Sequence, residues 1–523
     1  MSSQHIPSLL VGKGRVEQAT YLDPVIPNYQ GNPLIEALPL ILTQDETAKR
    51  LAFYPEYDEE HRKLPAYLRL HLIQNTLQFF APLPIHFDLE QRFSRMIRLG
   101  YQARNPAITG FWGDVQSRVQ SLGMVRQSPR STATGFTIVG ISGVGKTTSI
   151  EAILSLYPQV ILHSHYHDRD FSFTQIVWLK LDCPFDGSIK GLCLNFFQAV
   201  DDLLGTRYYD NYASGRKTVD ELLPRMALVA SLHSIGVLVI DEIQHLSQAK
   251  SGGSSKMLNF FVQLINTIGL PVVLVGTYKA ISVLSGEFRQ TRRGTGQGDL
   301  VWDRMKNDDI EKDKAKKDGS WTWFVQCLWV YQYVKKRCRL TVELRNALYE
   351  VTQGITDFAI KVYMLAQIRA IAKGEETVTE QGIRLAAKES LRLAYPILEA
   401  LKNKDTRILA SVEDVHPIDI NQFLQDAHSQ LNRATQLEAL AKRQVVAHSS
   451  QQSQSVIAST EQQDLTAVTT KKVSGRRKKA IPREGSLPEI ATSGEKQKLS
   501  AYEALRQAGL IRPVTEYLLE EVS

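Results

Sequence analysis

The octapeptide Gly140-Ile-Ser-Gly-Val-Gly-Lys-Thr147 constrains this chain more than any other feature, because it matches the phosphate-loop pattern GxxxxGK[ST] at every fixed position. The apolar run Phe136–Val139 precedes it and a helical pattern follows, which is the context that the pattern requires. Glycines let successive backbone N–H groups turn towards a phosphate, and the helix N-terminus adds partial positive charge. The loop therefore predicts a nucleotide site in an α/β domain; the alternative is a simple glycine turn.

Two residues of this loop have specific expected partners. Lys146 is expected to contact the β- and γ-phosphates of a nucleoside triphosphate, and Thr147 to give its hydroxyl to Mg²⁺. The loop therefore predicts a nucleoside triphosphate bound with Mg²⁺.

Two adjacent carboxylates, Asp241 and Glu242, follow the apolar run Val237–Ile240. We expect Asp241 to hold the Mg²⁺ shell and Glu242 to polarise the attacking water. Two acids at the end of a buried strand are costly to desolvate unless a cation or a polar network offsets that cost. The alternative is a helix N-cap Asp with a first-turn Glu, which the phosphate loop upstream disfavours.

Polar and basic residues follow the next apolar run, Val272–Val275. Thr277 is expected to orient the lytic water, and a helix cap is an equally weighted alternative.

Phosphoryl transfer also needs positive charge on the phosphate oxygens, often from the arginine of a neighbouring subunit. Arg289, Arg292 and Arg293 are the candidates, with a solvated basic turn as the alternative.

Short apolar runs alternate with helical patterns, which is typical of a parallel sheet buried on both faces. The runs are Phe136–Val139, Ile176–Leu181, Val237–Ile240 and Pro271–Val275. Glycines and mixed charges predict an exposed insertion at about 286–320. Apolar spacings of three and four then predict a smaller helical domain over about 342–401. With 43% hydrophobic and 22% charged residues, the composition excludes disorder throughout the chain.

Both ends of the chain differ from this centre. Residues 1 to about 95 are punctuated by proline and show no long periodic segment. Residues 449–463 are rich in Ser, Thr and Gln, and the seven basic residues between Lys471 and Arg483 account for the whole net charge of +7. This tail is expected to be unable to fold alone; binding to DNA phosphates and mere solubilisation are equal alternatives for its basic cluster. The folded body is thus near neutral.

Other features carry weaker predictions. His163, His165 and His167 alternate along an extended segment and form a possible metal cluster, although a polar loop explains them equally well. The four cysteines form no CxxC pair, which argues against a cysteine zinc site. No stretch is long and apolar enough for a membrane helix, and the polar start lacks a signal-peptide pattern, so we expect a cytoplasmic protein with no membrane contact.

Several segments together resemble TnsC, the family of AAA+ regulators of heteromeric Tns cut-and-paste transposons, including CRISPR-associated ones. They are the phosphate loop, Leu238–Ser247, the segment Ser251-Gly-Gly-Ser with Met257–Phe261, Phe288–Gly296, Asn32–Pro39 and Gly354–Ala370. The resemblance covers roughly residues 30–400. It implies an AAA+ α/β domain with a five-stranded parallel sheet flanked by helices, a small helical lid, an irregular N-terminal region and a partly disordered C-terminal tail.

The resemblance also implies a function. Members of this family form ATP-bound homo-oligomers, as rings or filaments, on double-stranded DNA. They link a target-selection protein of the TnsD or TniQ type to the transposase and its endonuclease partner. We therefore expect a slow, regulatory ATPase that switches a DNA-bound scaffold; the alternative is a DNA-remodelling motor or an initiator- or loader-type ATPase.

Site residues follow from the same resemblance. The nucleotide is expected to be held by Gly140, Ile141, Ser142, Gly143, Val144, Gly145, Lys146, Thr147 and Thr148. Asp241 and Glu242 would handle Mg²⁺ and water, Thr277 would be the polar sensor, and Arg289, Arg292 and Arg293 would be the finger candidates. An arginine is common near the start of the second-sensor helix in AAA+ lids, but Gly354–Phe358 has none, so this sensor is either absent or served by Lys361.

The predicted domain organisation divides the chain into six parts. These are an N-terminal region 1–95, a nucleotide-binding core 96–335, a helical lid 336–400, a helical extension 401–448, a disordered basic linker 449–497 and a partner-docking helix 498–523.

Overall fold

The computed structural model describes residues 14–120, 131–213, 217–248, 253–284, 298–309, 319–403, 424, 425 and 427. All of them belong to the first of the two units into which the chain divides, Met1–Arg443. Almost all of the predicted extension 401–448, and the whole of the predicted linker and docking helix, lie outside the described residues. None of the described helices is both long and apolar enough to span a membrane.

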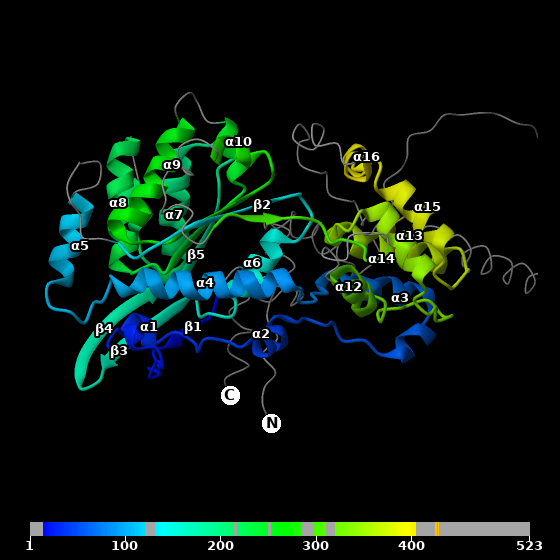
Figure 1. Cartoon of the computed structure of the whole chain (residues 1–523), viewed down its shortest axis with the longest axis horizontal. Coiled ribbons are helices and arrows are strands. Elements are labelled where there is room, and N and C mark those ends of the chain that lie inside the picture. Colours follow the sequence, from blue (N-terminus) through cyan, green and yellow to red (C-terminus); the bar gives the residue numbers. More distant parts are fainter. Residues whose placement is uncertain are drawn as a thin grey trace, which may run out of the picture. The chain divides into compact units, whose positions relative to one another are not determined.

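Five parallel strands form the central sheet, in the order β5-β6-β7-β2-β8 (Figure 1). Their bounds are β2 (Phe136–Gly140), β5 (Trp178–Asp182), β6 (Val237–Asp241), β7 (Val272–Gly276) and β8 (Leu300–Trp302). Every residue of the three inner strands β2, β6 and β7 is buried. The predicted α/β fold with a five-stranded parallel sheet is confirmed.

Helices cover both faces of this sheet (Figure 1). Val237 and Val239 of β6 pack into one apolar cluster with α4 (Pro84–Gln102) and α6 (Lys146–Leu154). Leu238 and Ile240 pack into a second cluster with α7 (Ile189–Leu204), α8 (Val219–Leu232), α9 (Gly253–Gln263) and η6 (Leu264–Ile268). Successive side chains of a strand point to opposite faces, so an all-apolar strand needs these two separate cores.

A second, three-stranded sheet was not predicted. It has the order β1-β3-β4, from β1 (Val16–Gln18), β3 (Val160–Tyr166) and β4 (Arg169–Ile176). Strands β1 and β3 are parallel, while β3 and β4 form an antiparallel hairpin. The predicted strand Ile176–Leu181 therefore spans the end of β4 and most of β5, which are separate strands in different sheets.

The prediction of an exposed insertion at 286–320 was wrong for part of that segment. Its described residues include β8, which pairs in parallel with β2 through Ile138 and Gly140. Trp302 at the end of β8 is buried, with 4% of its surface exposed. This part of the segment therefore adds an edge strand to the central sheet. It pairs with backbone groups of β2 that would otherwise be unpaired.

The predicted domain boundary at residue 95 was also wrong, because it falls inside α4. This helix runs along the sheet and begins at Pro84, the first helical position, where a proline is favoured. Before it come short helices and turns: η1 (Pro27–Tyr29), α1 (Pro33–Glu36), α2 (Gln44–Leu51), η2 (Glu59–Lys63), α3 (Ala66–Leu72) and η3 (Ile73–Gln78). The N-terminal region is thus continuous with the core.

Residues beyond the core form a helical bundle. Its helices are α12 (Ser320–Leu328), α13 (Val342–Thr352), α14 (Thr356–Ala372), α15 (Glu380–Ser390) and α16 (Tyr395–Asn403). Helix α14 is buried on most of its circumference, since α13, α15, α3 and η3 all contact it. The N-terminal region therefore supports the lid as well as the core.

A buried ion pair fixes this support. The guanidinium of Arg69 in α3 is fully buried and donates to both carboxylate oxygens of Glu376, at 2.6 and 2.8 Å. It also donates to the Leu64 and Tyr333 carbonyl oxygens. Burial alone raises the pKa of Glu376, but hydrogen bonds from Arg69 and from the Lys335 N–H outweigh burial and lower that pKa.

We expect Glu376→Gln to destabilise the chain by about 3 kcal/mol at neutral pH, because it leaves the Arg69 charge buried without its partner. The Glu376 pKa is lower in the folded chain than the ordinary glutamate pKa of about 4.3, so its carboxylate stabilises the fold fully above that ordinary value. As the pH falls from there through the lowered pKa, this stabilisation is lost and the difference from wild type should shrink. Urea unfolding at several pH values measures this. Glu60→Gln removes an exposed carboxylate paired with Lys63 and is the control; equal losses in both variants would contradict the prediction.

Candidate functional site

The phosphate loop lies between β2 and α6, at the carboxyl end of the central sheet. Gly143 and Gly145 have φ of +82° and +94°, values that glycine adopts without strain. Gly140 is required for a different reason. A Cβ there would lie 2.2 Å from the carbonyl oxygen of Trp302, so a side chain at this position would separate β8 from β2.

Lys146 begins α6 and its ammonium lies within the loop. The Nζ atom donates to the carbonyl oxygens of Gly140 at 3.0 Å and Ile141 at 2.8 Å, and the residue is 8% exposed. A buried ammonium held beside several glycine N–H groups forms a cradle whose charge suits the phosphates of a nucleotide.

The other predicted nucleotide residues differ in exposure. The side chains of Ile141 and Val144 are buried in the core, so these two loop residues can offer only backbone groups to a nucleotide. Ser142, Gly143 and Gly145 are partly exposed, and the side chain of Thr148 is exposed.

The hydroxyl of Thr147 donates to Oδ2 of Asp241 at 2.8 Å. This contact joins the start of α6 to the end of β6, two elements far apart in the sequence. Asp241 is only 3% exposed. A hydroxyl and a carboxylate at this distance form the hard oxygen pair that Mg²⁺ prefers, and an incoming nucleotide would add phosphate oxygens. The residues present therefore fit a Mg²⁺–nucleotide complex.

Lys180 on β5 was not predicted from the sequence. Its Nζ lies 3.6 Å from Oδ2 of Asp241 and 3.2 Å from Glu151. Burial alone lowers the pKa of Lys180, but the charges of Asp241, Asp182 and Glu151 outweigh it and raise that pKa. A charged Lys180 therefore partly offsets the cost of burying the Asp241 carboxylate.

Glu242 follows β6 in a left-handed conformation, with φ of 56°. Such a conformation is uncommon for this residue type and is found often at functional sites. The amide of Gln244 donates to the Glu242 carboxylate, and its Oε1 accepts from the backbone N–H of Thr277 at 3.1 Å. Gln244, which sequence reasoning missed, thus connects the predicted water-polarising carboxylate to the predicted sensor, just past the end of β7.

We expect Gln244→Leu to reduce the rate of ATP hydrolysis by about 100-fold with little change in ATP affinity, since Glu242 loses the amide that orients it and small misplacements cost about this much. A phosphate-release assay with a nucleotide titration measures both quantities. Gln78→Leu, at an exposed position in η3, is the control. A rate equal to that of the control would show that Gln244 does not position Glu242.

The lid touches the loop directly. The N–H of Asp357, in the first turn of α14, donates to the carbonyl oxygen of Gly143 at 3.0 Å, and the Thr356 hydroxyl donates to that of Val144 at 3.3 Å. Lys361, the candidate second sensor, pairs with Asp357 at 2.7 Å. The finger candidates Arg289, Arg292 and Arg293 lie outside the described residues.

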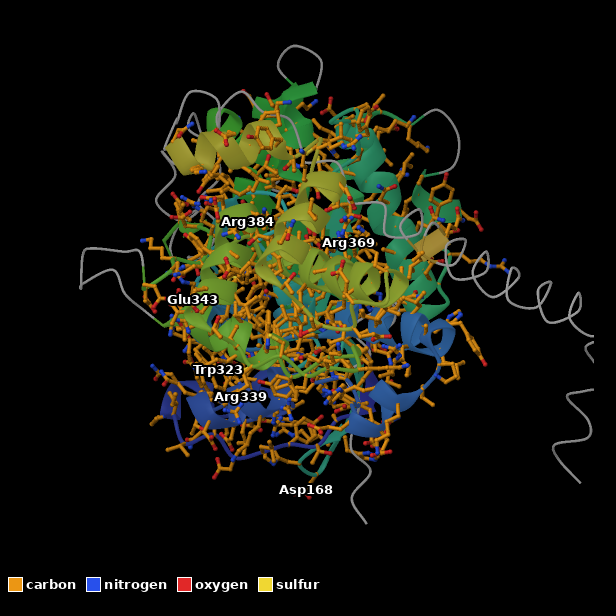
Figure 2. All side chains as sticks on the ribbon, turned by 90° about the vertical axis from the view of Figure 1, so that its right-hand side faces the viewer. Asp168, Trp323, Arg339, Glu343, Arg369 and Arg384 are labelled. Carbon is orange, nitrogen blue, oxygen red and sulfur yellow. The ribbon has the colours of Figure 1, made fainter. Side chains whose placement is uncertain are left out.

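The three histidines do not share one face. His163 is buried and bonds to the Tyr21 hydroxyl at 2.8 Å and the Gln175 amide oxygen at 2.9 Å. A β-bulge between His163 and His165 then turns the next imidazole outward. Asp168, at the tip of this hairpin, points away from the other labelled residues in Figure 2. Among the described residues, no three His, Cys, Asp or Glu side chains are grouped to hold a metal ion.

The sequence was compared with protein families, curated proteins and solved structures. It matches the family described as AAA domain over residues 129–284. Comparison with curated proteins gave no significant match. Among solved structures it is similar to the Walker-type ATPase PABY2304 of Pyrococcus abyssi, at 14% identity and a TM-score of 0.32 over 56% of this chain and 76% of that one.

Two other similar structures have comparable scores. Cdc6p from Pyrobaculum aerophilum is 14% identical, with a TM-score of 0.35 over 64% of this chain and 88% of that one. The Drosophila ORC bound to DNA is 12% identical, with a TM-score of 0.32 over 76% of this chain and 90% of that one. The family match covers β2, β6, β7 and the phosphate loop. Residues 129–284 therefore have the AAA+ P-loop fold, with the phosphate loop directly after β2.

Proposed function

We propose that this chain is an ATP-dependent DNA-binding regulator of transposition, which assembles as an oligomer on double-stranded target DNA. The observation that carries the ATP-dependent part is the 2.8 Å contact between Thr147 and Asp241, beside the buried ammonium of Lys146. The resemblance of six separate segments to TnsC supports the finer role. In this role the chain links a target-selection protein to the transposase and its endonuclease partner.

Each site residue has a role in this proposal. Lys146 and the N–H groups of the loop hold the phosphates, while Thr147 and Asp241 hold Mg²⁺, which would neutralise phosphate charge. Glu242 orients and polarises the attacking water, with Thr277 beside it. Hydrolysis is slow and switches the oligomer between a DNA-bound and a released state.

The nucleotide switch has a physical route to the lid. The loop carbonyl oxygens of Gly143 and Val144 accept hydrogen bonds from the start of α14. A phosphate drawn into the loop reorients the same peptide groups, so the position of α14 depends on whether nucleotide is bound. Surfaces on the lid then differ between the two states, which couples ATP to assembly.

We expect Arg289, Arg292 or Arg293 to complete the site of a neighbouring subunit, because a finger supplied in trans couples assembly to hydrolysis. Single Ala variants should identify the arginine whose loss reduces hydrolysis by about 1,000-fold. Mixing that variant with Lys146→Ala should then restore part of the activity, since each mixed interface can contain one intact composite site. If none of the three variants loses activity, the finger lies elsewhere.

DNA binding is the part of the proposal that a direct assay tests. The need to load wherever a selector directs it favours contacts to phosphates over contacts to bases. Because the body is near neutral, its positive charge must be concentrated where it meets the duplex. Affinity for a duplex should therefore fall steeply with salt and vary little with sequence. Removing residues 449–523, with the basic cluster, should leave ATP-dependent DNA binding largely intact. Loss of DNA binding in the truncated chain would show that the tail is the principal contact.

A further inference from the structure

A cavity of about 180 Å³ lies between the carboxyl end of α4, helix α5 (Phe111–Gln120) and the ends of α8 and η6. Its polar lining includes Arg104, Asn105, Arg118 and Ser231, and its apolar lining includes Ile108 and Val115. The neighbouring residues Ile235 and Ile268 precede β6 and β7 in the chain. Because the strands are parallel, this cavity lies at the opposite end of the sheet from the phosphate loop, and the nucleotide site does not use it.

Arg104 is the most unusual residue of this cavity, since its guanidinium is almost completely buried, with 4% of the residue exposed. Its Nε donates to the Gly100 carbonyl oxygen and its Nη1 to that of Ile235, both at 2.8 Å. The guanidinium also lies 4.9 Å from the centre of the Tyr101 ring. Its Nη2 has no hydrogen-bond partner among the described residues.

No carboxylate in the described part of the chain neutralises Arg104. The pKa of its guanidinium is lowered to about 10, mainly by burial; Tyr101 opposes this shift and the positive charge of Arg118 contributes to it. The carboxylate that lines the cavity, Asp114, is exposed and interacts with Arg118 in the next turn of α5.

A purely structural role accounts for only part of this arrangement. Arg104 follows α4 and satisfies the Gly100 carbonyl oxygen, so it acts as a cap at the negative end of that helix. A cap explains the bond from Nε to Gly100, while the bond from Nη1 to Ile235 joins the end of α4 to the segment before β6. It does not explain why a second arginine lines the same cavity, or why the buried Nη2 has no hydrogen-bond partner among the described residues.

We propose that this cavity is a binding site for a small oxyanion, a carboxylate or phosphoryl group that Arg104 and Arg118 hold together. A guanidinium recognises both groups through paired, charge-assisted hydrogen bonds. The volume suits such a ligand, since one water molecule takes about 30 Å³ in the liquid. The apolar wall of Ile108 and Val115 leaves room for a short carbon chain on the anion.

Inorganic phosphate and acetate are the probes, measured by calorimetry at low ionic strength on the whole chain carrying Lys146→Ala, so that the phosphate loop does not contribute. We expect one binding event in this background. Adding Arg118→Gln should weaken it by at least about 10-fold, which corresponds to one charge-assisted contact. Adding Ile108→Glu should weaken it similarly, because Ile108 is 62% exposed and a glutamate there supplies a carboxylate at the rim of the cavity.

Arg50→Gln is the matched control, because it removes the same charge from an exposed position on α2. It should leave the affinity unchanged. Absence of binding for both probes up to about 20 mM would overturn the proposal, because two guanidinium groups that hold one oxyanion should bind it more tightly than that. Equal weakening by Arg118→Gln and Arg50→Gln would overturn it too, because the interaction would then depend on net charge and not on this cavity. Comparison of phosphate with acetate shows which of the two groups the site prefers.

Discussion

Replacing Lys146 by Ala is expected to abolish ATP binding at concentrations that saturate the wild-type chain, with a loss of affinity of at least about 100-fold. The reason is geometric. The ammonium is buried beside the loop carbonyl oxygens of Gly140 and Ile141, and the charge-assisted bonds that it would make to phosphate oxygens have no substitute within the loop. ATP-dependent DNA binding should disappear together with ATP binding. A fluorescent ATP analogue titrated against both proteins measures the change.

The control for this experiment is Lys49→Ala, which removes an exposed ammonium paired with Asp45 on α2. It should bind ATP and DNA as wild type does. If Lys146→Ala retained wild-type ATP affinity, the assignment of the phosphate loop would be wrong. If it lost ATP but kept DNA binding, the loop assignment would stand and the nucleotide switch would not.

Replacing Glu242 by Gln is expected to reduce hydrolysis by about 100- to 1,000-fold while ATP affinity changes little. The amide has the same shape as the carboxylate but cannot accept the proton of the attacking water, and a positioned base contributes a factor of this order. Asp241 and Thr147, which hold Mg²⁺, are unchanged by the substitution. Phosphate release and nucleotide titration separate the two effects.

The same variant distinguishes a scaffold from a motor. A scaffold that hydrolysis only dismantles should persist on DNA and remain permissive for insertion when Glu242 is replaced. A motor that remodels DNA should bind but stop working. Dissociation of the variant from DNA at the wild-type rate in the presence of ATP would contradict the scaffold role.

The inner strands and the phosphate loop could be predicted because their signals are local. Strand β6 is apolar up to Ile240, Asp241 ends it and Glu242 follows, and the loop has fixed glycines. Strand β8 could not be predicted in this way. It has only three residues within a stretch rich in glycine and charge, and its pairing with β2 depends on long-range contacts such as that between Gly140 and Trp302.

Helix α4 is different, since the sequence did contain a signal for it. Leu89, Phe93, Met96 and Ile97 recur at helical spacing, and Pro84 stands where a helix favours proline. The prolines around it suggested an irregular segment, which hid the start of the helix and placed the domain boundary inside it.

Parts of the site depend on contacts that no sequence pattern reveals. Gln244 acquires its role because β6 and β7 are neighbours, which brings the Thr277 N–H within reach of its amide oxygen. Lys180 reaches Asp241 only because β5 pairs with β6. Sequence reasoning proposes candidates for the chemistry, but it missed the residues that contact and position them.

The most direct test of the ATP-gated DNA-binding proposal is the amount of the whole chain retained on a long duplex with ATP, with ADP and without nucleotide, each in the presence of Mg²⁺. An ATP switch predicts retention with ATP alone, as complexes larger than one subunit, and release when ADP replaces ATP. Glu242→Gln should be retained longer than wild type, and Lys146→Ala should not be retained. Equal retention of the wild-type chain under all three conditions would contradict the proposal, because nucleotide would then have no influence on DNA binding.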